Sequence, residues 1–216
     1  YTLVGVADYL FRLARRKADA LGVSLEEATA PYKPVACSNL SSSRALRDVA
    51  ESYGGRYLSS AVGEVNVTTL MHKCGALIGG EGNGGVIYPA SHYGRDAMTG
   101  VALFLSSLAD RGLKTSELKK TFPAYFIAKN KIELSDKALI DKILSELKTI
   151  YAKEEINDID GVKIIFEAKK QWVHLRRSNT EPIIRIYSEA STPEAAEALG
   201  NDVIKVAQSI IGNVLV

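Results

Sequence analysis

Apolar residues in the first part of the chain alternate between helical and strand-like spacing. From Leu3 to Ala14 they recur every three or four positions, which predicts an amphipathic helix that starts at the first residue with nothing to cap it. Such a start hints at a chain cut from a longer one. Short apolar runs predict strands at 34–40, 56–62, 76–80 and 86–89, and helical spacing predicts helices at 44–53, 67–75 and 95–109. Strands interleaved with helices predict an α/β layer structure.

The pattern changes near Pro123. A strand-like alternation at 125–134 is followed by an amphipathic helix over 139–151, for which Ser135 is the predicted N-cap. Strand-like runs at 162–168, 172–177 and 183–190 then follow one another through short loops, and Thr192-Pro193 starts a last helix. This order predicts an antiparallel meander within a separate α+β module. We place the boundary between Thr121 and Phe126.

Composition and charge exclude several classes of protein. Of 216 residues, 46% are hydrophobic and 24% are charged, which excludes a disordered chain. No apolar run approaches the roughly 20 residues of a membrane span. Lys and Arg total 27 against 25 Asp and Glu, so neither nucleic acid nor a membrane is an expected partner. Cys37 and Cys74, without a CxxC pattern, indicate reduced thiols and predict a cytoplasmic location.

The glycine-rich segment Gly79-Gly80-Glu81-Gly82-Asn83-Gly84-Gly85 is the first candidate binding loop. Its glycines match the dinucleotide pattern GxGxxG, but a strand-like run follows where that motif requires a helix, and Glu81 would face the phosphates. The Glu81 carboxylate and the Asn83 amide suit sugar hydroxyls, which need both acceptors and donors, and the glycines would let a ligand approach the backbone. A turn that merely needs positive φ angles explains the same glycines, and that alternative stays open.

The second candidate is the polar loop between two strand-like runs from Arg176 to Arg185. Ser178, Asn179 and Thr180 offer hydroxyl, amide and backbone donors, and the two arginines could hold a dianion from either side. These donors suit a phosphate group. A hairpin turn with solvated arginines, one of them paired with Glu181 or Glu189, accounts for the same residues equally well.

Both loops resemble segments of one protein family. RRSNTEPIIRIYSEA closely resembles the RxSNTEPxxRxxxEA phosphate-binding loop of the α-D-phosphohexomutases, the phosphoglucomutase/phosphomannomutase family. GGEGNGGVIY resembles the sugar-binding loop of that family, YGRDAMTGVALFLSSLA the helix after it, and SNLSSSRALRDVAESYGG an earlier strand, turn and helix. The resemblance implies a parent enzyme with three α/β domains and a fourth related to the TATA-binding protein. Residues 1–20 would be the helical tail of the preceding domain, 21–124 the three-layer α/β sugar-binding third domain, and 125–216 the α+β phosphate-binding fourth domain.

The resemblance also implies roles for individual residues. Sugar hydroxyls would be held by the glycine-rich loop, through Glu81, Gly82, Asn83 and Gly84. The substrate phosphate that is not being transferred would be held by Arg176, Ser178, Asn179 and Thr180, with Arg185 in support. The whole enzyme would interconvert hexose 1-phosphate and hexose 6-phosphate through a hexose 1,6-bisphosphate.

The reactive parts of that mechanism are expected outside this chain. The family's phosphoserine lies in the first domain and its Mg²⁺ on an Asp-rich loop of the second, so we expect this chain to bind hexose phosphate weakly and to hold neither catalytic residues nor metal. Ser91 in Ala90-Ser91-His92 lacks the Asn-Pro of the family's serine loop, and a surface serine is the better interpretation. Asp158-Ile159-Asp160-Gly161 lacks the third acid and the arginine of DGDxDR and is better explained as a turn. The expected partners are hexose phosphate and the missing N-terminal domains.

The chain departs from the family pattern at several points. Gly63-Glu64 stands where the family often has a GH or GD pair, and the serines at 41–43 stand where many members have a lysine. These departures leave the remaining sugar contacts open, and the segment 15–33 has no obvious counterpart. The alternative function is a non-catalytic sugar-phosphate-binding protein, which the gene sequence upstream of Tyr1 would distinguish from the enzyme.

Overall fold

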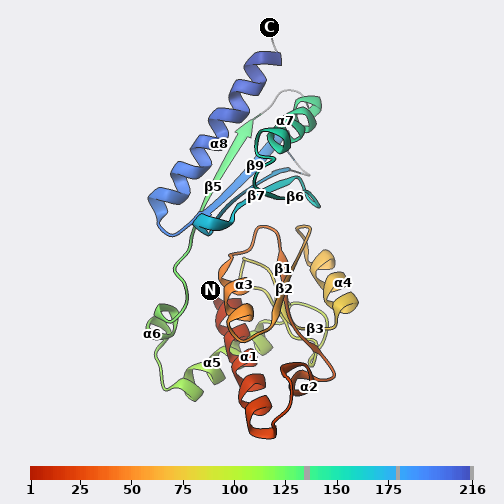
Figure 1. The fold of residues 1–216 in the computed structure, drawn as a ribbon, viewed down its shortest axis with the longest axis vertical. Coiled ribbons are helices and arrows are strands. Elements are labelled where there is room, and N and C mark those ends of the chain that lie inside the picture. The colour runs from red at the N-terminus through yellow and green to blue at the C-terminus, as the bar shows by residue number, and fades with distance from the viewer. Residues whose placement is uncertain (134–136, 179–180, 215–216) are drawn as a thin grey trace. The chain divides into compact units, whose positions relative to one another are not determined.

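The computed structural model describes residues 1–133, 137–178 and 181–214, and its contacts divide the chain into two units. The first unit runs from Tyr1 to Pro123 and the second from Ala124 to Val216. The division falls inside the interval from Thr121 to Phe126 that the change of pattern indicates. The ribbon of each unit can be followed separately in Figure 1.

The first unit is built around one sheet whose strands lie in the order β2-β1-β3-β4. Strands β1, β2 and β3 run parallel, and the short β4 pairs antiparallel with β3. The strands are β1 (Lys33–Asn39), β2 (Arg56–Ser60), β3 (Ala76–Gly80) and β4 (Val86–Ile87). The helices are α1 (Thr2–Leu21), α2 (Leu25–Thr29), α3 (Ala45–Ser52), α4 (Glu64–Cys74), α5 (Ala97–Arg111) and α6 (Thr115–Lys120). The parallel strands and their crossover helices confirm the predicted α/β class.

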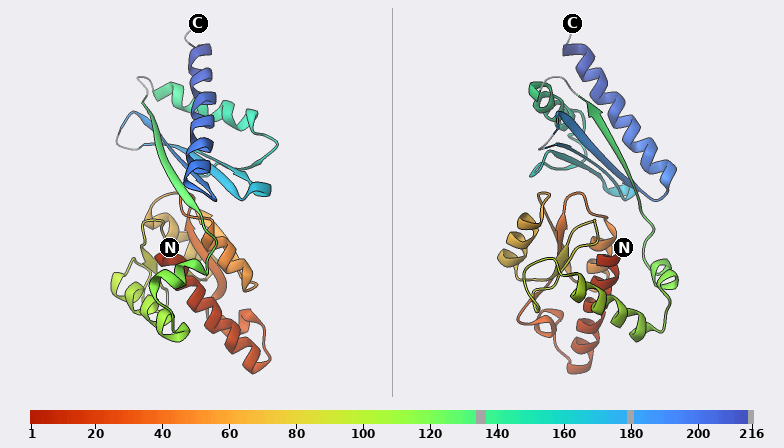
Figure 2. Two further views of the ribbon diagram at one scale, coloured as in Figure 1. Left: turned by 90° about the vertical axis from the view of Figure 1, so that its left-hand side faces the viewer. Right: turned by 180° about the vertical axis from the view of Figure 1, so that it is seen from behind.

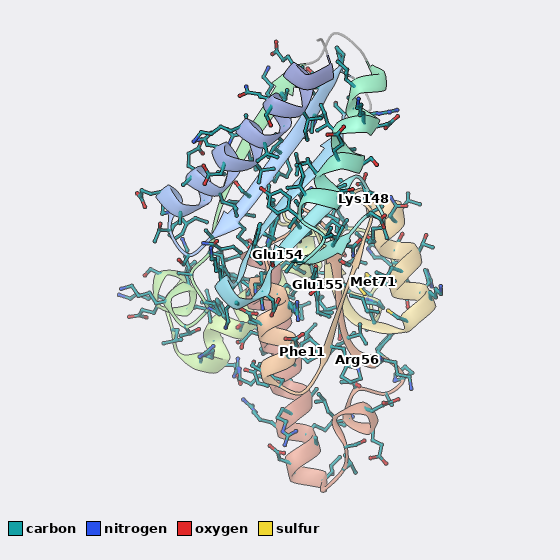
Figure 3. All side chains as sticks on the ribbon, turned by 45° about the horizontal axis from the view of Figure 1, so that its top comes forward. Phe11, Arg56, Met71, Lys148, Glu154 and Glu155 are labelled. Atoms are coloured by element: carbon teal, nitrogen blue, oxygen red, sulfur yellow. The ribbon has the colours of Figure 1, made fainter. Side chains whose placement is uncertain are left out.

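Helices cover both faces of this sheet, as Figure 2 shows. On one face, Val67 and Met71 of α4 pack on Val35, Cys37 and Ile87 of the strands. On the other face, α1 packs against α3 and the sheet, and its Phe11 stacks on the Tyr53 ring. Phe11 and Met71, labelled in Figure 3, therefore come from helices on opposite sides of the sheet. The three layers of helix, sheet and helix are those that the resemblance implies.

Helix α1 packs as part of the first unit. Every apolar residue that predicted it, from Leu3 to Ala14, is buried, and the helix ends at Gly22, which adopts the left-handed conformation. Its assignment as the tail of a preceding domain stays a prediction. A capping box starts the next helix, with Glu27 N–H donating to Ser24 Oγ at 3.1 Å and Ser24 N–H donating to Glu27 Oε2 at 2.9 Å.

Helix α5 forms where the spacing predicts it, but much of its apolar side is exposed. Val101 is 54% exposed and Leu105 57%, whereas Gly100 and Ser107 lie on the buried side. Gly100 brings the helix against β4, because a Cβ at this position would lie 3.2 Å from the Val86 side chain. The helix that the spacing predicted is therefore present, but its apolar face around Val101 and Leu105 is not covered by any described residue.

The second unit is an antiparallel sheet in the order β5-β9-β8-β7-β6 with helices packed on its apolar face. Its elements are β5 (Phe126–Glu133), α7 (Lys137–Ile150), β6 (Glu155–Asn157), β7 (Val162–Phe166), the 3-10 turn η1 (Glu167–Lys169), β8 (Gln171–Arg177), β9 (Ile183–Ala190) and α8 (Pro193–Val214). The predicted meander is present as β7-β8-β9, whereas the edge strand β6 was not predicted. The α+β class is confirmed, while the Ser135 cap lies outside the described residues.

The core of the second unit follows from strand alternation. Residues facing α7 and α8 include Val173 and Leu175 of β8 and Ile184 and Ile186 of β9, all fully buried. The intervening residues point to the opposite face of the sheet, and they are mostly polar or charged. At the start of α8, Ala195 N–H donates to Thr192 Oγ1 at 3.1 Å, as the Thr-Pro sequence predicts. The register of β8 and β9 therefore determines which polar residues share that second face.

Candidate functional site

The glycine-rich loop begins at the carboxyl end of β3, where loops from parallel strands gather. Glu81 N–H donates to the Gly85 carbonyl at 3.1 Å and Gly84 N–H to the Glu81 carbonyl at 3.1 Å, which closes a tight turn before β4. A Cβ on Gly80 would lie 1.9 Å from the Gly85 carbonyl oxygen, so position 80 admits no side chain. Gly84 has φ 95°, a conformation that favours glycine.

Glu81 is the buried acid of this loop, with 6% of its surface exposed. Asn39, at the end of β1, donates from Nδ2 to Glu81 Oε1 at 2.8 Å. The other carboxylate oxygen, Oε2, lies 3.4 Å from Nη1 of Arg95. Among the described residues each oxygen therefore has one partner, and a carboxylate oxygen can accept a second hydrogen bond.

Asn39 connects the glycine-rich loop to the serine turn after β1. Its Oδ1 accepts hydrogen bonds from Ser41 N–H at 3.1 Å and from Ser42 Oγ at 2.9 Å. Gly82 passes close to that turn, since a Cβ there would lie 3.3 Å from the Ser42 Cα. The two turns at the carboxyl ends of β1 and β3 thus form one hydrogen-bonded structure.

Asn83 occupies the exposed tip of the loop. Its Oδ1 accepts from Gly85 N–H at 3.0 Å, and the nitrogen of the same amide carries two N–H donors. An open pocket of about 520 Å³ lies beside the loop, with Asn83, Gly84, Arg95, Asp96 and Val101 in its lining. Asp96 caps α5, and hydrogen bonds from Thr99, with smaller contributions from His92 and Met98, lower its pKa to about 2.

In the second unit, the candidate phosphate loop connects β8 to β9. Ser178 is buried, and its N–H donates to the Ile183 carbonyl at 3.0 Å. Asn179 and Thr180 lie outside the described residues. Arg176 of β8 stands directly opposite Arg185 of β9, and Lys131 of β5 stands opposite Arg185 on its other side. Three cationic residues therefore form a row across three strands beside the loop.

The two arginines differ in their partners. Arg185 Nη2 lies 2.9 Å from Glu181 Oε2 and 3.5 Å from Ser178 Oγ, so the expected pair with Glu181 forms. Arg176 has a buried Nε with no hydrogen-bond partner among the described residues. Like charges placed directly opposite each other in a sheet are destabilising, and a buried donor without a partner costs free energy. An anion beside Arg176 would relieve both effects.

The same face of the sheet continues into buried polar residues that the sequence did not single out as a set. Lys163 lies over the Trp172 ring at 4.0 Å, and Trp172 Nε1 donates to Glu189 Oε1 at 2.6 Å. His174 hydrogen-bonds through Nε2 to the Asp160 carbonyl at 2.7 Å. Burial lowers the pKa of His174 to about 4, and the positive charges of Lys163 and Arg176 act in the same direction. Burial is therefore the main reason that the imidazole is held neutral, although the hydrogen bond to the Asp160 carbonyl acts in the opposite direction.

The remaining candidates are Ser91, the turn that begins at Asp158, and the two cysteines. Ser91 lies in the turn after β4 and is exposed, and its Oγ accepts from Thr99 Oγ1 at 3.4 Å. Asp158 in the turn before β7 pairs with Lys148, labelled in Figure 3, at 3.2 Å. Cys37 and Cys74 are free thiols with their sulfurs 3.6 Å apart, and burial raises the pKa of Cys37. Within the described residues no cluster of three or more His, Cys, Asp or Glu side chains could hold a metal ion. The helices of that part of the chain also include none with the length and apolar character to cross a bilayer.

The sequence missed three residues around Glu81: Asn39, Glu64 and Arg95. Asn39 is a polar residue at the end of a buried strand, and this position could have identified it from the sequence as a candidate site residue. Arg95 lies within the YGRDAMTG segment and Glu64 within the departure Gly63-Glu64, but only the structure brings both beside the loop. Lys131 was likewise visible only through its register in the sheet.

The fold and these loops define a chain of the phosphohexomutase type, with an α/β unit followed by an α+β unit. The family model "Phosphoglucomutase/phosphomannomutase, alpha/beta/alpha domain III" matches residues 18–125, and the model of the family's C-terminal domain matches residues 130–206. The chain therefore belongs to the phosphoglucomutase/phosphomannomutase family and comprises its domains III and IV.

Curated relatives carry several mutase names. A phosphoglucosamine/phosphogalactosamine mutase of Sulfurisphaera tokodaii is 33% identical over 78% of this chain and 37% of its own length. A phosphoglucomutase/phosphomannomutase of Thermococcus kodakarensis is 38% identical over 74% of this chain and 34% of its own length. The chain thus spans little more than a third of these relatives.

Solved structures share the fold. A phosphoglucomutase/phosphomannomutase family protein from Burkholderia thailandensis has a TM-score of 0.67 at 22% identity, covering 94% of this chain and 42% of its own. An N-acetylphosphoglucosamine mutase from Aspergillus fumigatus, solved in complex with glucose 1,6-bisphosphate, has a TM-score of 0.64 at 14% identity, covering 96% and 42%. At these identities the likeness concerns the fold.

Proposed function

We propose that this chain is the substrate-binding C-terminal part of a phosphohexomutase that interconverts hexose 1-phosphate and hexose 6-phosphate through a bisphosphate. The observation that carries the proposal is the row of Arg176, Arg185 and Lys131 beside the Ser178 loop. This row places like charges opposite one another, and Arg176 Nε is buried without a partner among the described residues. A phosphate dianion would accept charge-assisted hydrogen bonds from both arginines.

Glu81 supplies the sugar-binding part of the proposal. Its two oxygens each retain one acceptor position beyond their contacts with Asn39 and Arg95, so the carboxylate can accept hydrogen bonds from two hydroxyls. The side-chain amide of Asn83 adds donors at the exposed loop tip, and Gly82 and Gly84 carry no side chain that could block a ligand. Carboxylate, amide and exposed backbone together suit a hexose.

The two loops would perform complementary tasks in the whole enzyme. Holding one phosphate and the sugar ring fixes the other end of the substrate for reaction, and a bisphosphate that turns over exchanges the two ends. The phosphoserine would come from a preceding domain, and Mg²⁺ bound there would neutralise charge on the transferred phosphoryl group. Bisphosphate binding by the A. fumigatus fold relative is consistent with this proposal. A cytoplasmic location stays a prediction.

Calorimetric titration of the chain tests the binding part of the proposal. The ligands are the 1-phosphates of glucose, mannose, glucosamine and galactosamine, with inorganic phosphate and free glucose as controls. We expect each hexose phosphate that is a substrate to bind more tightly than inorganic phosphate, and free glucose to bind least. Equal affinity for hexose phosphates and phosphate would contradict a sugar site.

Mutase activity is tested on the product of the complete gene. The reading frame upstream of Tyr1 should encode a serine loop and an Asp-rich loop, and its product should convert glucose 1-phosphate to glucose 6-phosphate. Hexose-phosphate binding by a gene product that encodes neither loop would instead favour a non-catalytic sugar-phosphate-binding protein.

A further inference from the structure

Arg95 lies between two carboxylates that come from different parts of the first unit. Its Nε lies 2.7 Å from Oε2 of Glu64, and its backbone N–H donates to Oε1 of the same residue at 3.0 Å. Its Nη1 lies 3.4 Å from Oε2 of Glu81. Glu64 opens α4 and Glu81 follows β3, so Arg95 connects three segments distant in sequence.

Glu64 fixes the near end of this arrangement. Both its carboxylate oxygens accept from Arg95, and these hydrogen bonds hold the pKa of Glu64 below its usual value. A doubly hydrogen-bonded carboxylate restrains both the backbone and the guanidinium of Arg95. Glu64 therefore acts as a brace for Arg95 at the position where the family often has a GH or GD pair.

Gly85 gives Arg95 its path to Glu81. A Cβ on Gly85 would lie 2.5 Å from Cδ and 3.1 Å from Cγ of Arg95, both in the middle of that side chain. Gly85 is not among the glycines with a positive φ, so the requirement at this position is space and not backbone conformation. A methyl group at position 85 would therefore clash with the Arg95 side chain in its observed conformation.

The far end of the arrangement is the buried Glu81 carboxylate. Asn39 donates to one oxygen at 2.8 Å and Arg95 lies 3.4 Å from the other, so a donor near each oxygen restrains the orientation of the carboxylate. Without Arg95 only one oxygen would be held, and the carboxylate could rotate about its terminal bond, whose torsional preference is broad. We infer that Arg95, braced by Glu64 and admitted by Gly85, is a positioning residue that holds Glu81 in the orientation that binds the sugar. The inference rests on the proposed contact between Glu81 and a hexose.

The test separates sugar binding from phosphate binding in the 216-residue chain. Arg95→Ala should weaken glucose 1-phosphate binding about five- to tenfold, the loss of one charge-assisted contact, while inorganic phosphate binds as before. Arg95→Lys should recover part of the affinity, because an ammonium group can still reach a carboxylate. Arg47→Ala is the matched control, since it removes another arginine that contacts a glutamate, Glu51, at 2.9 Å on α3, and it should change neither affinity.

Gly85→Ala provides an independent way to displace Arg95. It should weaken glucose 1-phosphate binding at least as much as Arg95→Ala, because the new Cβ would also lie 3.2 Å from Asn83 Oδ1, and the double variant should be no weaker than Gly85→Ala. Additive losses would overturn the inference, as would parallel losses of hexose-phosphate and phosphate binding. If Arg95→Ala leaves glucose 1-phosphate affinity unchanged while Glu81→Ala lowers it, the positioning role fails and the proposed function stands.

A ligand-independent measurement keeps the inference testable if sugar binding itself fails. The side-chain amide of Asn39 reports on Glu81 through their hydrogen bond, and its resonances can be followed by ¹H–¹⁵N NMR. Arg95→Ala and Gly85→Ala should shift or broaden these resonances in the same way, and Arg47→Ala should not. Unchanged Asn39 resonances in both variants would show that Arg95 does not position Glu81.

Discussion

The candidate loops of the two units satisfy their charges in opposite ways. In the first unit, the Glu81 carboxylate is buried, and both its oxygens already have partners in Asn39 and Arg95. In the second unit, Arg176 faces Arg185 across the strands and keeps a buried Nε without a partner among the described residues. The side chains of the first loop are therefore held in place by the protein itself, whereas the second loop has a cationic donor that an anion could pair with.

This difference assigns different energetic roles to the two loops. A preorganised carboxylate loses little freedom when it binds neutral hydroxyls, so it contributes mainly to selectivity for the sugar. Cations with unmet hydrogen-bonding capacity gain most from a dianion, so the second loop should supply most of the affinity.

Burial of His174 should make the stability of the second unit depend on pH. The pKa of His174 is about 4 in the folded chain, against 6.5 ordinarily, so between these pH values the unfolded chain binds a proton that the folded chain does not. Stability is therefore full above about pH 6.5 and falls as the pH decreases toward 4, by up to about 3 kcal/mol. The single tryptophan, Trp172, is buried in this unit, so its fluorescence can follow unfolding in urea at each pH.

His174→Gln is the control, because glutamine keeps a donor for the Asp160 carbonyl but does not titrate. The difference in unfolding free energy between the original chain and this variant should vary with pH only within this window. A difference that is constant from pH 7 to pH 4 would show that His174 is not held neutral. Added phosphate should raise the pKa of His174, since an anion beside Arg176 offsets the charge that disfavours the imidazolium.

Arg176→Ala should have the largest effect on ligand binding. Loss of a charge-assisted contact to a partly buried dianion is expected to cost about 1.5–3 kcal/mol, roughly 10- to 150-fold in affinity for hexose phosphate. Inorganic phosphate should lose a similar factor, because this contact does not involve the sugar. Calorimetry with glucose 1-phosphate and with phosphate measures both.

Arg177→Ala is the matched control for Arg176. Arg177 is the next residue of the same strand, points to the other face and pairs with Asp141 at 2.8 Å. Its removal should leave both affinities unchanged. Equal affinities of the original chain and Arg176→Ala would remove Arg176 from the phosphate site.

Glu81→Ala should affect the sugar-binding loop of the first unit. Hexose-phosphate affinity should fall while inorganic phosphate binds as before, and the first unit should lose on the order of 1–2 kcal/mol of stability because the Asn39 amide is left buried without this acceptor. Glu81→Gln keeps the acceptor for Asn39, so it should recover the stability but not the full sugar affinity. Glu51→Ala, which removes an exposed acid on α3, should change neither property, and an equal loss of phosphate and hexose-phosphate binding in Glu81→Ala would argue against a sugar contact.

The same contrast explains how far the sequence could predict the two sites. Elements with a strong period, such as α1 and β8, lie where the spacing indicates, because burial of an apolar face determines both pattern and structure. The short edge strand β6 and the exposed side of α5 were not predictable, since spacing does not say which apolar faces the chain itself covers. Local motifs pointed to Glu81 and Arg176, but Arg95, Asn39 and Lys131 act across the fold, and only strand order and register bring them near.

Lys131 gives the smallest effect and the most specific test of the cationic row. It stands opposite Arg185 but is exposed, and its ammonium contacts Glu133 at 2.7 Å, so water and this acid screen it from a bound phosphate. Lys131→Ala should therefore weaken phosphate and hexose-phosphate binding by only about two- to threefold, and the loss should disappear in high salt. Lys129 is the matched control, because it lies two residues away on the same strand and face, over the Tyr187 ring at 5.6 Å, one step removed from the arginine pair. If the three cations of the row attract the anion together, Lys131→Ala should lose more phosphate affinity at low salt than Lys129→Ala. Equal losses of affinity would mean that only the net charge of the sheet matters, and that the register of Lys131 with Arg185 has no part in binding.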